Sequence, residues 1–368
     1  MFTIQTLNKI SATGLSVLNP DLYTCADAPE APDAVIVRSA SMHDMSIPQS
    51  VLSIARAGAG YNNIPVEACT EQGICVFNTP GANAGAVKEL TICALLLASR
   101  KIAAGAKWCL SLAGDADAAK KIEKGKSAFA GPEIAGKTLG VIGLGAIGRM
   151  VAEAAQALGM QIIGFDPFLK NSDFETVSDI NEIFKRSDYI TMHAPLTEDT
   201  KNTINADTLA LCKDGVRIVN FARGGLVNTA DLLAALASGK CAAYVTDFPA
   251  PEMIGVDGVT ALPHLGASTP ESEENCAVMA SRQTADYLEN GNVTNSVNLP
   301  RLRKDGKSAR VTVITAGDHA EELARLLNMT DYVSAVRGSV GYVIADEAAA
   351  NAGRLADLDY VIRYRVLD

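Results

Sequence analysis

Three ionisable side chains in the second half of the sequence could together carry out acid–base chemistry on a small anion. Arg223, Glu252 and His264 belong to three segments that lie at the ends of strands or in loops. A histidine can move a proton near neutral pH, and an arginine can hold a carboxylate through charge-assisted hydrogen bonds. Glu252 beside the imidazole would raise the pKa of His264 and orient its ring. The three residues together suit chemistry at a carbon that carries a hydroxyl group next to a carboxylate. The alternative is a structural role, since an Arg-Gly-Gly run can begin a helix and a lone histidine is often structural.

A glycine-rich turn upstream indicates a site for a second, larger molecule. Gly143, Gly145 and Gly148 form a Gly-x-Gly-x-x-Gly pattern that follows an apolar run and opens an amphipathic stretch. The first glycine permits a tight turn, the second lets the backbone approach a pyrophosphate, and the third lets helix and strand pack closely. The backbone of Ala146 and Ile147 would complete an anion site at the helix N-terminus. The pattern is weak alone, but in this strand–turn–helix context it predicts a dinucleotide site.

Asp166 ends the next predicted strand, roughly 20 residues beyond the last glycine, where dinucleotide-binding folds carry an acidic residue. A carboxylate there accepts hydrogen bonds from the adenosine ribose and repels a 2′-phosphate, so the sequence favours NAD over NADP. The alternative is a surface aspartate at a strand end.

Four further residues complete the predicted cofactor contacts. Asp247 could bind the nicotinamide end, and Ala222 and Gly266 lie beside the catalytic candidates in the sequence. His193 ends a predicted strand, and it either lines the cofactor cleft or has a packing role.

Short apolar runs alternate with amphipathic stretches along most of the chain, which predicts an α/β fold with a parallel sheet and helices on both faces. In such an open sheet, ligands bind at the carboxyl ends of the strands, where the candidate residues are expected. The predicted strands are 35–37, 74–77, 139–142, 161–165, 189–192, 216–220 and 242–246. The predicted helices are 146–158, 180–186, 229–238 and 271–289.

Two segments interrupt this alternation. The charged segment 111–137 is predicted to be an exposed connection close to a domain boundary, and the basic run after Pro300 is predicted to be a linker. The following order of elements is a small βαββαβ unit, an α/β sandwich in outline. Its elements are strand 311–315, helix 321–327, strands 332–336 and 340–344, helix 347–356 and strand 360–367.

The composition is ordinary for a globular protein and narrows the possible partners. The formal net charge of −10 argues against nucleic acid as a partner, and it means that an anionic substrate needs a local basic pocket. None of the eight cysteines forms a Cys-x-x-Cys pair or lies at zinc-ligand spacing with a histidine. We therefore expect no metal site, and we expect free thiols in a reducing cytoplasm. No signal peptide or membrane span is expected.

Several motifs together resemble the D-2-hydroxyacid dehydrogenase family over about residues 35–300. They are Val37-Arg-Ser, Arg56-Ala-Gly-Ala-Gly-Tyr-Asn-Asn, Phe77-Asn-Thr-Pro, Gly136-Lys-Thr-Leu-Gly-Val-Ile-Gly-Leu-Gly-Ala-Ile-Gly, His193-Ala-Pro-Leu-Thr, the Arg223 segment and Pro263-His-Leu-Gly-Ala-Ser-Thr. The run that begins at Gly266 is most similar to the branch of the family that oxidises 3-phosphoglycerate.

The resemblance implies an NAD-dependent enzyme that transfers a hydride between the cofactor and C2 of a small D-2-hydroxy acid. It assigns catalysis to Arg223, Glu252 and His264. It also implies two Rossmann-like domains joined by a hinge, followed by a small C-terminal domain. The substrate domain would comprise residues 1–98 and 284–300, the NAD-binding domain residues 99–283, and the C-terminal domain residues 301–368.

The 3-phosphoglycerate branch implies oxidation of 3-phospho-D-glycerate to 3-phosphohydroxypyruvate, which is the entry to serine synthesis. Arg38 and Arg56 would meet the phosphate end of the substrate, and the backbone amides of Gly58, Ala59 and Gly60 would meet its carboxylate. An acidic protein needs such local cations to hold a trianion. Each arginine could instead belong to a surface ion pair.

Two other functions remain open on the sequence alone. A glyoxylate or hydroxypyruvate reductase uses the same scaffold, and the fold also serves NAD(H)-sensing corepressors. The presence of Arg223, Glu252 and His264 together favours an enzyme. The resemblance favours a homodimer through the cofactor domains, or a homotetramer if the tail pairs.

The tail resembles a reduced ACT domain, a small ligand-binding module. The stretch after Val313 contains Gly317 and His319 but lacks the Asn and the Pro-Gly turn that hold serine in serine-regulated relatives. Acidic residues nearby would repel a carboxylate. We therefore expect an assembly or vestigial module, and no inhibition by serine at physiological concentration.

Overall fold

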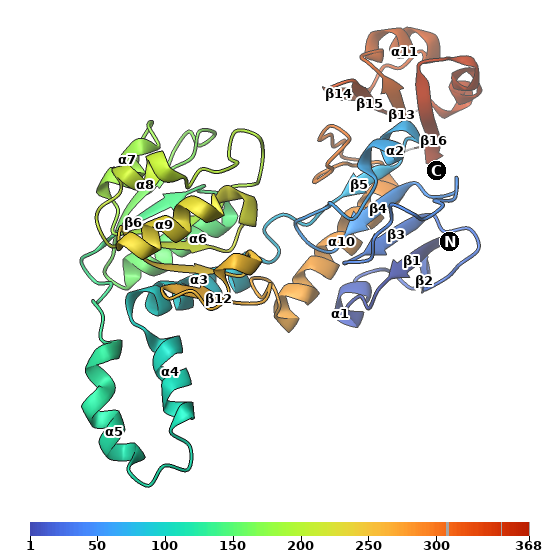
Figure 1. The fold of residues 1–368 in the computed structure, drawn as a ribbon. Helices are drawn as coiled ribbons and strands as arrows, with labels where there is room; N and C mark the ends of the chain where they lie inside the picture. The colour runs from blue at the N-terminus through green and yellow to red at the C-terminus, as the bar shows by residue number, and fades with distance from the viewer. Residues whose placement is uncertain (307–308, 347, 368) are drawn as a thin grey trace. The chain divides into compact units, whose positions relative to one another are not determined.

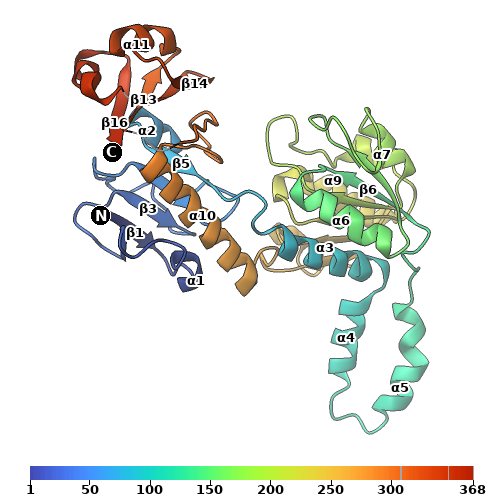
Figure 2. The ribbon, with the colours of Figure 1, turned by 180° about the vertical axis from the view of Figure 1, so that it is seen from behind.

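The computed structural model describes residues 1–306, 309–346 and 348–367, and the chain divides into two compact units (Figure 1; Figure 2 shows the opposite side). Unit 1 comprises Met1–Asn83 and Thr269–Asp368, and unit 2 comprises Ala84–Ser268. The chain crosses between the units at the start of two long helices, α3 (Ala84–Ser99) and α10 (Pro270–Asn290). The expected boundaries at residues 98 and 284 fall inside these helices, because each helix belongs to the unit that it enters.

Unit 2 is built on a seven-stranded parallel sheet with the strand order β12-β11-β10-β9-β6-β7-β8. Its central strands are almost entirely buried, as a parallel sheet covered on both faces requires. The strands predicted in this half of the chain are all confirmed. The bounds are β6 (Thr138–Ile142), β7 (Gln161–Phe165), β8 (Glu175–Thr176), β9 (Tyr189–Met192), β10 (Val216–Asn220), β11 (Cys241–Thr246) and β12 (Val259–Ala261).

Helices cover both faces of this sheet because neighbouring strand residues point to opposite sides. Val141 packs in the core formed with α3 and α6, whereas Ile142 packs in the core formed with α7, α8 and α9. The remaining bounds are α6 (Ala146–Ala157), α7 (Asn181–Arg186), α8 (Ala206–Leu211), η2 (Gly224–Leu226), α9 (Thr229–Ser238) and η3 (Pro251–Met253).

The charged segment after α3 differs from its prediction. It is exposed, as expected, but it forms a helical hairpin of α4 (Ile102–Ser111), α5 (Ala118–Gly125) and η1 (Lys126–Phe129) within unit 2. Alanine and lysine are strong helix formers, and this propensity explains α5. Trp108 and Phe129 join the two arms, with ring centroids 5.2 Å apart. The hairpin is seen below the sheet in Figure 1.

Unit 1 contains a five-stranded parallel sheet with the order β2-β1-β3-β4-β5. Only β3 and β5 were predicted; β4 has the sequence Ser-Ile-Ala-Arg, which offers a single β-branched residue as a signal. The bounds are β1 (Phe2–Leu7), α1 (Ala12–Leu15), β2 (Tyr23–Ala26), β3 (Ala34–Val37), β4 (Ser53–Arg56), α2 (Val66–Glu71) and β5 (Cys75–Phe77).

Helix α10 returns the chain to unit 1, and its ends follow the expected capping chemistry. The Thr269 side chain accepts a hydrogen bond from the Ser272 amide at 3.1 Å, Pro270 occupies the first turn, and Gly291 ends the helix at φ 73°. The helix packs closely on α1, where a Cβ on Gly14 would lie 2.1 Å from the Cβ of Ala277. Within the described part of the chain, neither α10 nor any other helix combines the length and apolar character needed to cross a membrane.

The tail forms a four-stranded antiparallel sheet with the order β14-β15-β13-β16, which confirms the predicted βαββαβ order of elements. The second helix of the tail is a 3₁₀ helix. Its expected start at Glu347 lies outside the described residues, and so do residues 307 and 308 of the expected linker. The bounds are β13 (Arg310–Ala316), α11 (Ala320–Leu327), β14 (Tyr332–Arg337), β15 (Val340–Asp346), η4 (Ala349–Asp357) and β16 (Val361–Leu367).

The tail sheet is a further layer of unit 1. One of its faces packs with α11 and η4. Its other face presents Ile314, Tyr342 and Ile344 to a core that also contains Phe77 and Tyr287. The Tyr342 hydroxyl donates to the Gly291 carbonyl oxygen at 2.6 Å. The tail therefore shares its hydrophobic core with the five-stranded sheet and α10.

Candidate active site

The glycine-rich turn between β6 and α6 has the geometry of an anion site. Gly143 adopts φ 91°, and a Cβ on Gly148 would lie 1.9 Å from the Gly143 carbonyl oxygen, so both positions require glycine for the fold itself. A Cβ on Gly145 would meet nothing within 4 Å, and its φ of −68° suits any residue. The space above Gly145 thus fits a ligand that approaches the backbone at the α6 N-terminus, where Ala146 and Ile147 begin the helix.

Asp166 lies beside this turn, directly after β7. One of its carboxylate oxygens accepts a hydrogen bond from the Leu144 amide at 2.9 Å, and the other accepts one from the Phe168 amide at 3.0 Å. These bonds fix the negative charge of Asp166 next to the glycine-rich turn. A charge held there would repel the 2′-phosphate of NADP and so favour NAD.

His193 follows β9 and packs against the same turn. A Cβ on Gly143 would lie 2.9 Å from the His193 carbonyl carbon, and the His193 Nε2 lies 3.0 Å from the Thr191 hydroxyl. Burial lowers the pKa of the His193 imidazole to about 4. The ring is therefore neutral at physiological pH, and it is a poor candidate for an acid in the reaction.

Arg223 is held by a buried polar residue at the carboxyl end of β10. The Asn220 side chain donates to the Arg223 carbonyl oxygen at 2.8 Å and accepts from the Ala222 amide at 3.1 Å. The Tyr244 hydroxyl lies 3.3 Å from the same amide nitrogen of Asn220. Asn220 thereby shapes the loop and leaves the Arg223 side chain exposed to bind an anion.

Phe248 lies between the two main catalytic candidates. Its ring centroid is 4.4 Å from that of His264, and the Arg223 guanidinium carbon is 5.8 Å from its centroid. One aromatic ring therefore contacts both the proton-transfer candidate and the cation. Sequence reasoning missed this role, because the contact depends on where the loops after β10, β11 and β12 meet.

Asp247 is buried, with 2% exposure, at the end of β11. Its Oδ2 accepts a hydrogen bond from the Gly266 amide at 2.8 Å, while its Oδ1 has no hydrogen-bond partner within the described residues. Burial raises the pKa of the Asp247 carboxyl group, and the bond from Gly266 opposes that effect. A buried acceptor without a partner fits a ligand that donates a hydrogen bond, such as a carboxamide.

Glu252 is the one catalytic candidate that the structure does not bring to the others. It lies exposed on η3, and in the described part of the chain no ion pair or hydrogen bond joins it to His264. Its expected effect on the imidazole stays a prediction.

The candidate substrate residues cluster at the carboxyl ends of β3 and β4 in unit 1. Arg38 Nη2 lies 2.6 Å from the Glu273 carboxylate, and Arg56 Nε donates to the Arg38 carbonyl oxygen at 3.0 Å. The Arg56 guanidinium lies over Gly58, where a Cβ would be 1.5 Å from Nη1. The Arg56 guanidinium thus adjoins the Gly58–Gly60 turn, as an anion site needs. The Arg38 guanidinium pairs with Glu273, which agrees with the ion-pair alternative for Arg38.

Comparison with known proteins identifies the family. Residues 92–266 match the model described as D-isomer specific 2-hydroxyacid dehydrogenase, NAD binding domain. A hydroxypyruvate reductase of Thermotoga maritima is 40% identical over 259 residues, which are 67% of this chain and 81% of that protein. The chain belongs to the D-isomer specific 2-hydroxyacid dehydrogenase family. Unit 2 therefore carries the NAD-binding domain of this family, and the expected fold class is confirmed.

Two further relatives carry a more specific name. A D-3-phosphoglycerate dehydrogenase of Methanocaldococcus jannaschii is 38% identical over 287 residues, 74% of this chain and 53% of that protein. The NAD⁺-bound structure of 3-phosphoglycerate dehydrogenase from Entamoeba histolytica is 27% identical, with a TM-score of 0.64 over 82% of this chain and 99% of that one. The chain spans about half the length of the M. jannaschii relative.

Proposed function

We propose that this family member oxidises 3-phospho-D-glycerate to 3-phosphohydroxypyruvate with NAD. The observation that carries the substrate is the Arg56 guanidinium beside the Gly58–Gly60 turn, with Arg38 following the neighbouring strand β3. Two cations and a row of backbone amides suit a molecule with a phosphate at one end and a carboxylate at the other. The M. jannaschii and E. histolytica relatives bear the name of this activity.

The proposed chemistry divides between a proton and a hydride. NAD, when bound, accepts the hydride from C2 of the hydroxy acid. His264 accepts the proton of the C2 hydroxyl group as the carbonyl forms, and Arg223 binds the carboxylate and stabilises the developing charge. Phe248 holds both side chains in place through ring contacts. Glu252 is proposed to orient the imidazole.

The cofactor residues are proposed to act in three groups. Gly143, Gly145 and Gly148, with Ala146 and Ile147, would hold the pyrophosphate. Asp166 would bind the adenosine ribose. His193, Ala222, Asp247 and Gly266 would line the nicotinamide end, with the free Oδ1 of Asp247 accepting from the carboxamide.

A second candidate is reduction of glyoxylate or hydroxypyruvate. The specific support is the T. maritima hydroxypyruvate reductase, of which this chain covers the larger share. An NAD(H)-sensing corepressor is less well supported, because the cluster of Arg223, Phe248 and His264 suits turnover.

A steady-state panel of 2-hydroxy and 2-keto acids with NAD(H) and NADP(H) tests the proposal. We expect the highest kcat/KM with 3-phosphoglycerate or 3-phosphohydroxypyruvate and NAD(H). A preference for glyoxylate or unphosphorylated hydroxypyruvate would replace the first proposal with the second, and no turnover of any acid would support a cofactor-sensing protein.

We also propose that the protein is a cytoplasmic homodimer or homotetramer. All eight cysteines are free thiols, which suits a reducing compartment. On the α4–α5 hairpin, Leu110 is 76% exposed and Ile102 is 46% exposed, which suits a surface covered by a second copy. We further propose that the tail is an ACT-like module and that serine does not inhibit the protein through it.

A further inference from the structure

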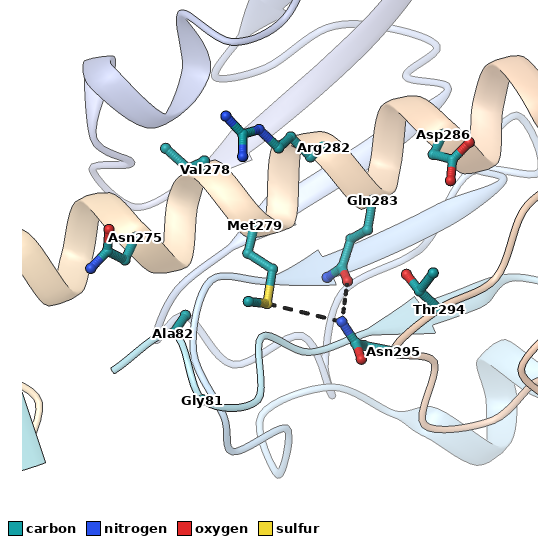
Figure 3. Close-up of a pocket in the computed structure, with 10 residues that line it drawn as sticks. All are labelled: Gly81, Ala82, Asn275, Val278, Met279, Arg282, Gln283, Asp286, Thr294 and Asn295. Atoms are coloured by element: carbon teal, nitrogen blue, oxygen red, sulfur yellow. Dashed lines mark hydrogen bonds between the residues drawn. The ribbon is translucent and has the colours of Figure 1, made fainter. Parts of the chain in front are cut away.

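A polar hollow of about 520 Å³ lies along α10 in unit 1, apart from every residue assigned above (Figure 3). Its size falls within the range of small-molecule sites. Three segments form its walls: the Gly81–Ala82 loop, the middle of α10, and Thr294–Asn295. The lining side chains on α10 are Asn275, Val278, Met279, Arg282, Gln283 and Asp286.

Two opposite charges line the hollow one helical turn apart. Arg282 and Asp286 are separated by four residues on α10, yet no ion pair joins them within the described part of the chain. Asp286 is held in place because its Oδ1 accepts hydrogen bonds from the side-chain amides of Asn290 and Asn292, both at 2.9 Å. Within the described residues the other Asp286 oxygen has no hydrogen bond or ion pair, although Arg303 interacts with this carboxylate electrostatically. The Arg282 guanidinium also has no hydrogen bond or ion pair there, so the two charges can each take a ligand group.

Two side-chain amides also line the hollow, Gln283 from α10 and Asn295 from the segment that faces the helix. Asn295 donates to the Gln283 side-chain oxygen at 3.3 Å and to the Met279 sulfur at 4.0 Å, as the two dashed lines in Figure 3 show. Gln283 is only 6% exposed. A side-chain amide both donates and accepts, so it matches another amide at either atom. Met279 supplies an apolar surface beside them.

We propose that this hollow is a second small-molecule site, which takes a zwitterionic amino acid with a long, amide-bearing side chain. Arg282 binds its carboxylate, Asp286 binds its ammonium group, and Gln283 and Asn295 bind its side chain. A short amino acid such as serine fills the charged end only and binds more weakly. L-Glutamine is the simplest probe with all three groups.

A hydrogen-bonded path leads from this site to the Gly58–Gly60 turn. The Gln283 side chain donates to the Asn78 carbonyl oxygen at 2.8 Å, and the Asn78 amide donates to the Asn295 carbonyl oxygen at 3.2 Å. The Asn78 side chain in turn donates to the Ala59 carbonyl oxygen at 2.6 Å. A ligand that repositions Gln283 therefore repositions the turn proposed to bind the substrate carboxylate, and this coupling rests on the proposed function.

Binding is tested first, on the full chain without substrate. Titration calorimetry with L-glutamine should give saturable binding at millimolar concentrations or below, and weaker binding of L-serine. Arg282→Ala and Asp286→Asn should each weaken binding by about tenfold or more, since each removes a hydrogen bond to a charged group. Arg301→Ala, which removes an exposed arginine outside the hollow, should leave binding unchanged. No binding of L-glutamine, or binding that both pocket variants retain, would overturn the site.

The coupling is tested with whichever 2-hydroxy acid the protein turns over. L-Glutamine should change the KM for that acid severalfold in the unmodified protein and in Arg301→Ala. The Arg282→Ala variant should keep the basal KM and lose the response. Binding without any change in KM would overturn the coupling. If 3-phosphoglycerate proves not to be the substrate, the calorimetric result still decides the site, so the two failures are distinguishable.

Discussion

Among single residues, the proposed chemistry falls to a few side chains that buried neighbours hold at strand ends. Arg223 and His264 are exposed to a ligand, whereas Asn220 and Asp247 behind them are buried and fix the loops. Phe248 contacts both exposed side chains. Rigid support of this kind is what positions catalytic groups for reaction.

The role of His264 in proton transfer gives the first prediction. His264→Gln should lower kcat by about 10²–10⁴-fold, the usual cost of losing a general acid–base group. NADH affinity, measured by fluorescence titration, should stay nearly unchanged because the proposed pyrophosphate and ribose contacts lie at the β6–α6 turn and Asp166, and glutamine keeps the size of the side chain near the nicotinamide end. A variant that keeps the wild-type kcat would show that another group moves the proton.

Cofactor choice is predicted to rest on Asp166. Asp166→Asn keeps the size of the side chain and removes its charge. The preference for NAD over NADP in kcat/KM should fall by about tenfold or more, because a hydrogen bond to a charged group contributes about 1.5–3 kcal/mol. Equal use of both cofactors by the unmodified protein would contradict this assignment.

Among the elements, the β6–α6 turn contains two kinds of glycine. Gly143 and Gly148 are required by the fold, whereas Gly145 leaves space for a ligand. Gly148→Ala should destabilise unit 2 by about 1–3 kcal/mol, because its Cβ would press on the Gly143 carbonyl oxygen. Gly145→Ala should change stability by about 1 kcal/mol or less. It should nevertheless weaken NAD binding strongly, since the added methyl group occupies the open space above the turn. Thermal melts of the apo protein and NAD titrations check both statements, and equal effects of the two variants on stability would contradict them.

The same elements show what could be predicted from the sequence. The β6–α6 unit and Asp166 were predictable because their signals are local: an apolar run, a glycine pattern and an acidic residue at a fixed distance. The strand β4 was missed because four residues with one β-branched side chain carry little pattern. Helix α5 was missed because its charges were interpreted as a solvated connection. Phe248 was missed because its contacts join loops that are distant in sequence. Asn220 was missed because its bonds to Ala222 and Arg223, although local, follow no pattern that the sequence shows.

At the scale of the whole molecule, the tail is expected to unfold together with the rest of unit 1. Tyr342 is fully buried in the shared core and donates to Gly291. Tyr342→Ala should lower the free energy of unfolding by about 3–5 kcal/mol, as truncation of a large buried ring does. Val366→Ala, at a tail position that is 44% exposed, is the matched control and should have little effect. A separate low-temperature transition for the tail, with the rest of unit 1 unaffected, would show that the tail folds independently.

The proposed function requires that the molecule recognises a phosphorylated 2-hydroxy acid. The most direct measurement compares kcat/KM for 3-phospho-D-glycerate and D-glycerate in the unmodified protein, Arg38→Ala, Arg56→Ala and the control Arg301→Ala. We predict a strong preference for the phosphorylated acid. Each of the first two variants should lose that preference by about tenfold or more through a raised KM for 3-phospho-D-glycerate alone, while the control keeps it. A preference for D-glycerate in the unmodified protein, or equal losses on both acids in the variants, would contradict the account.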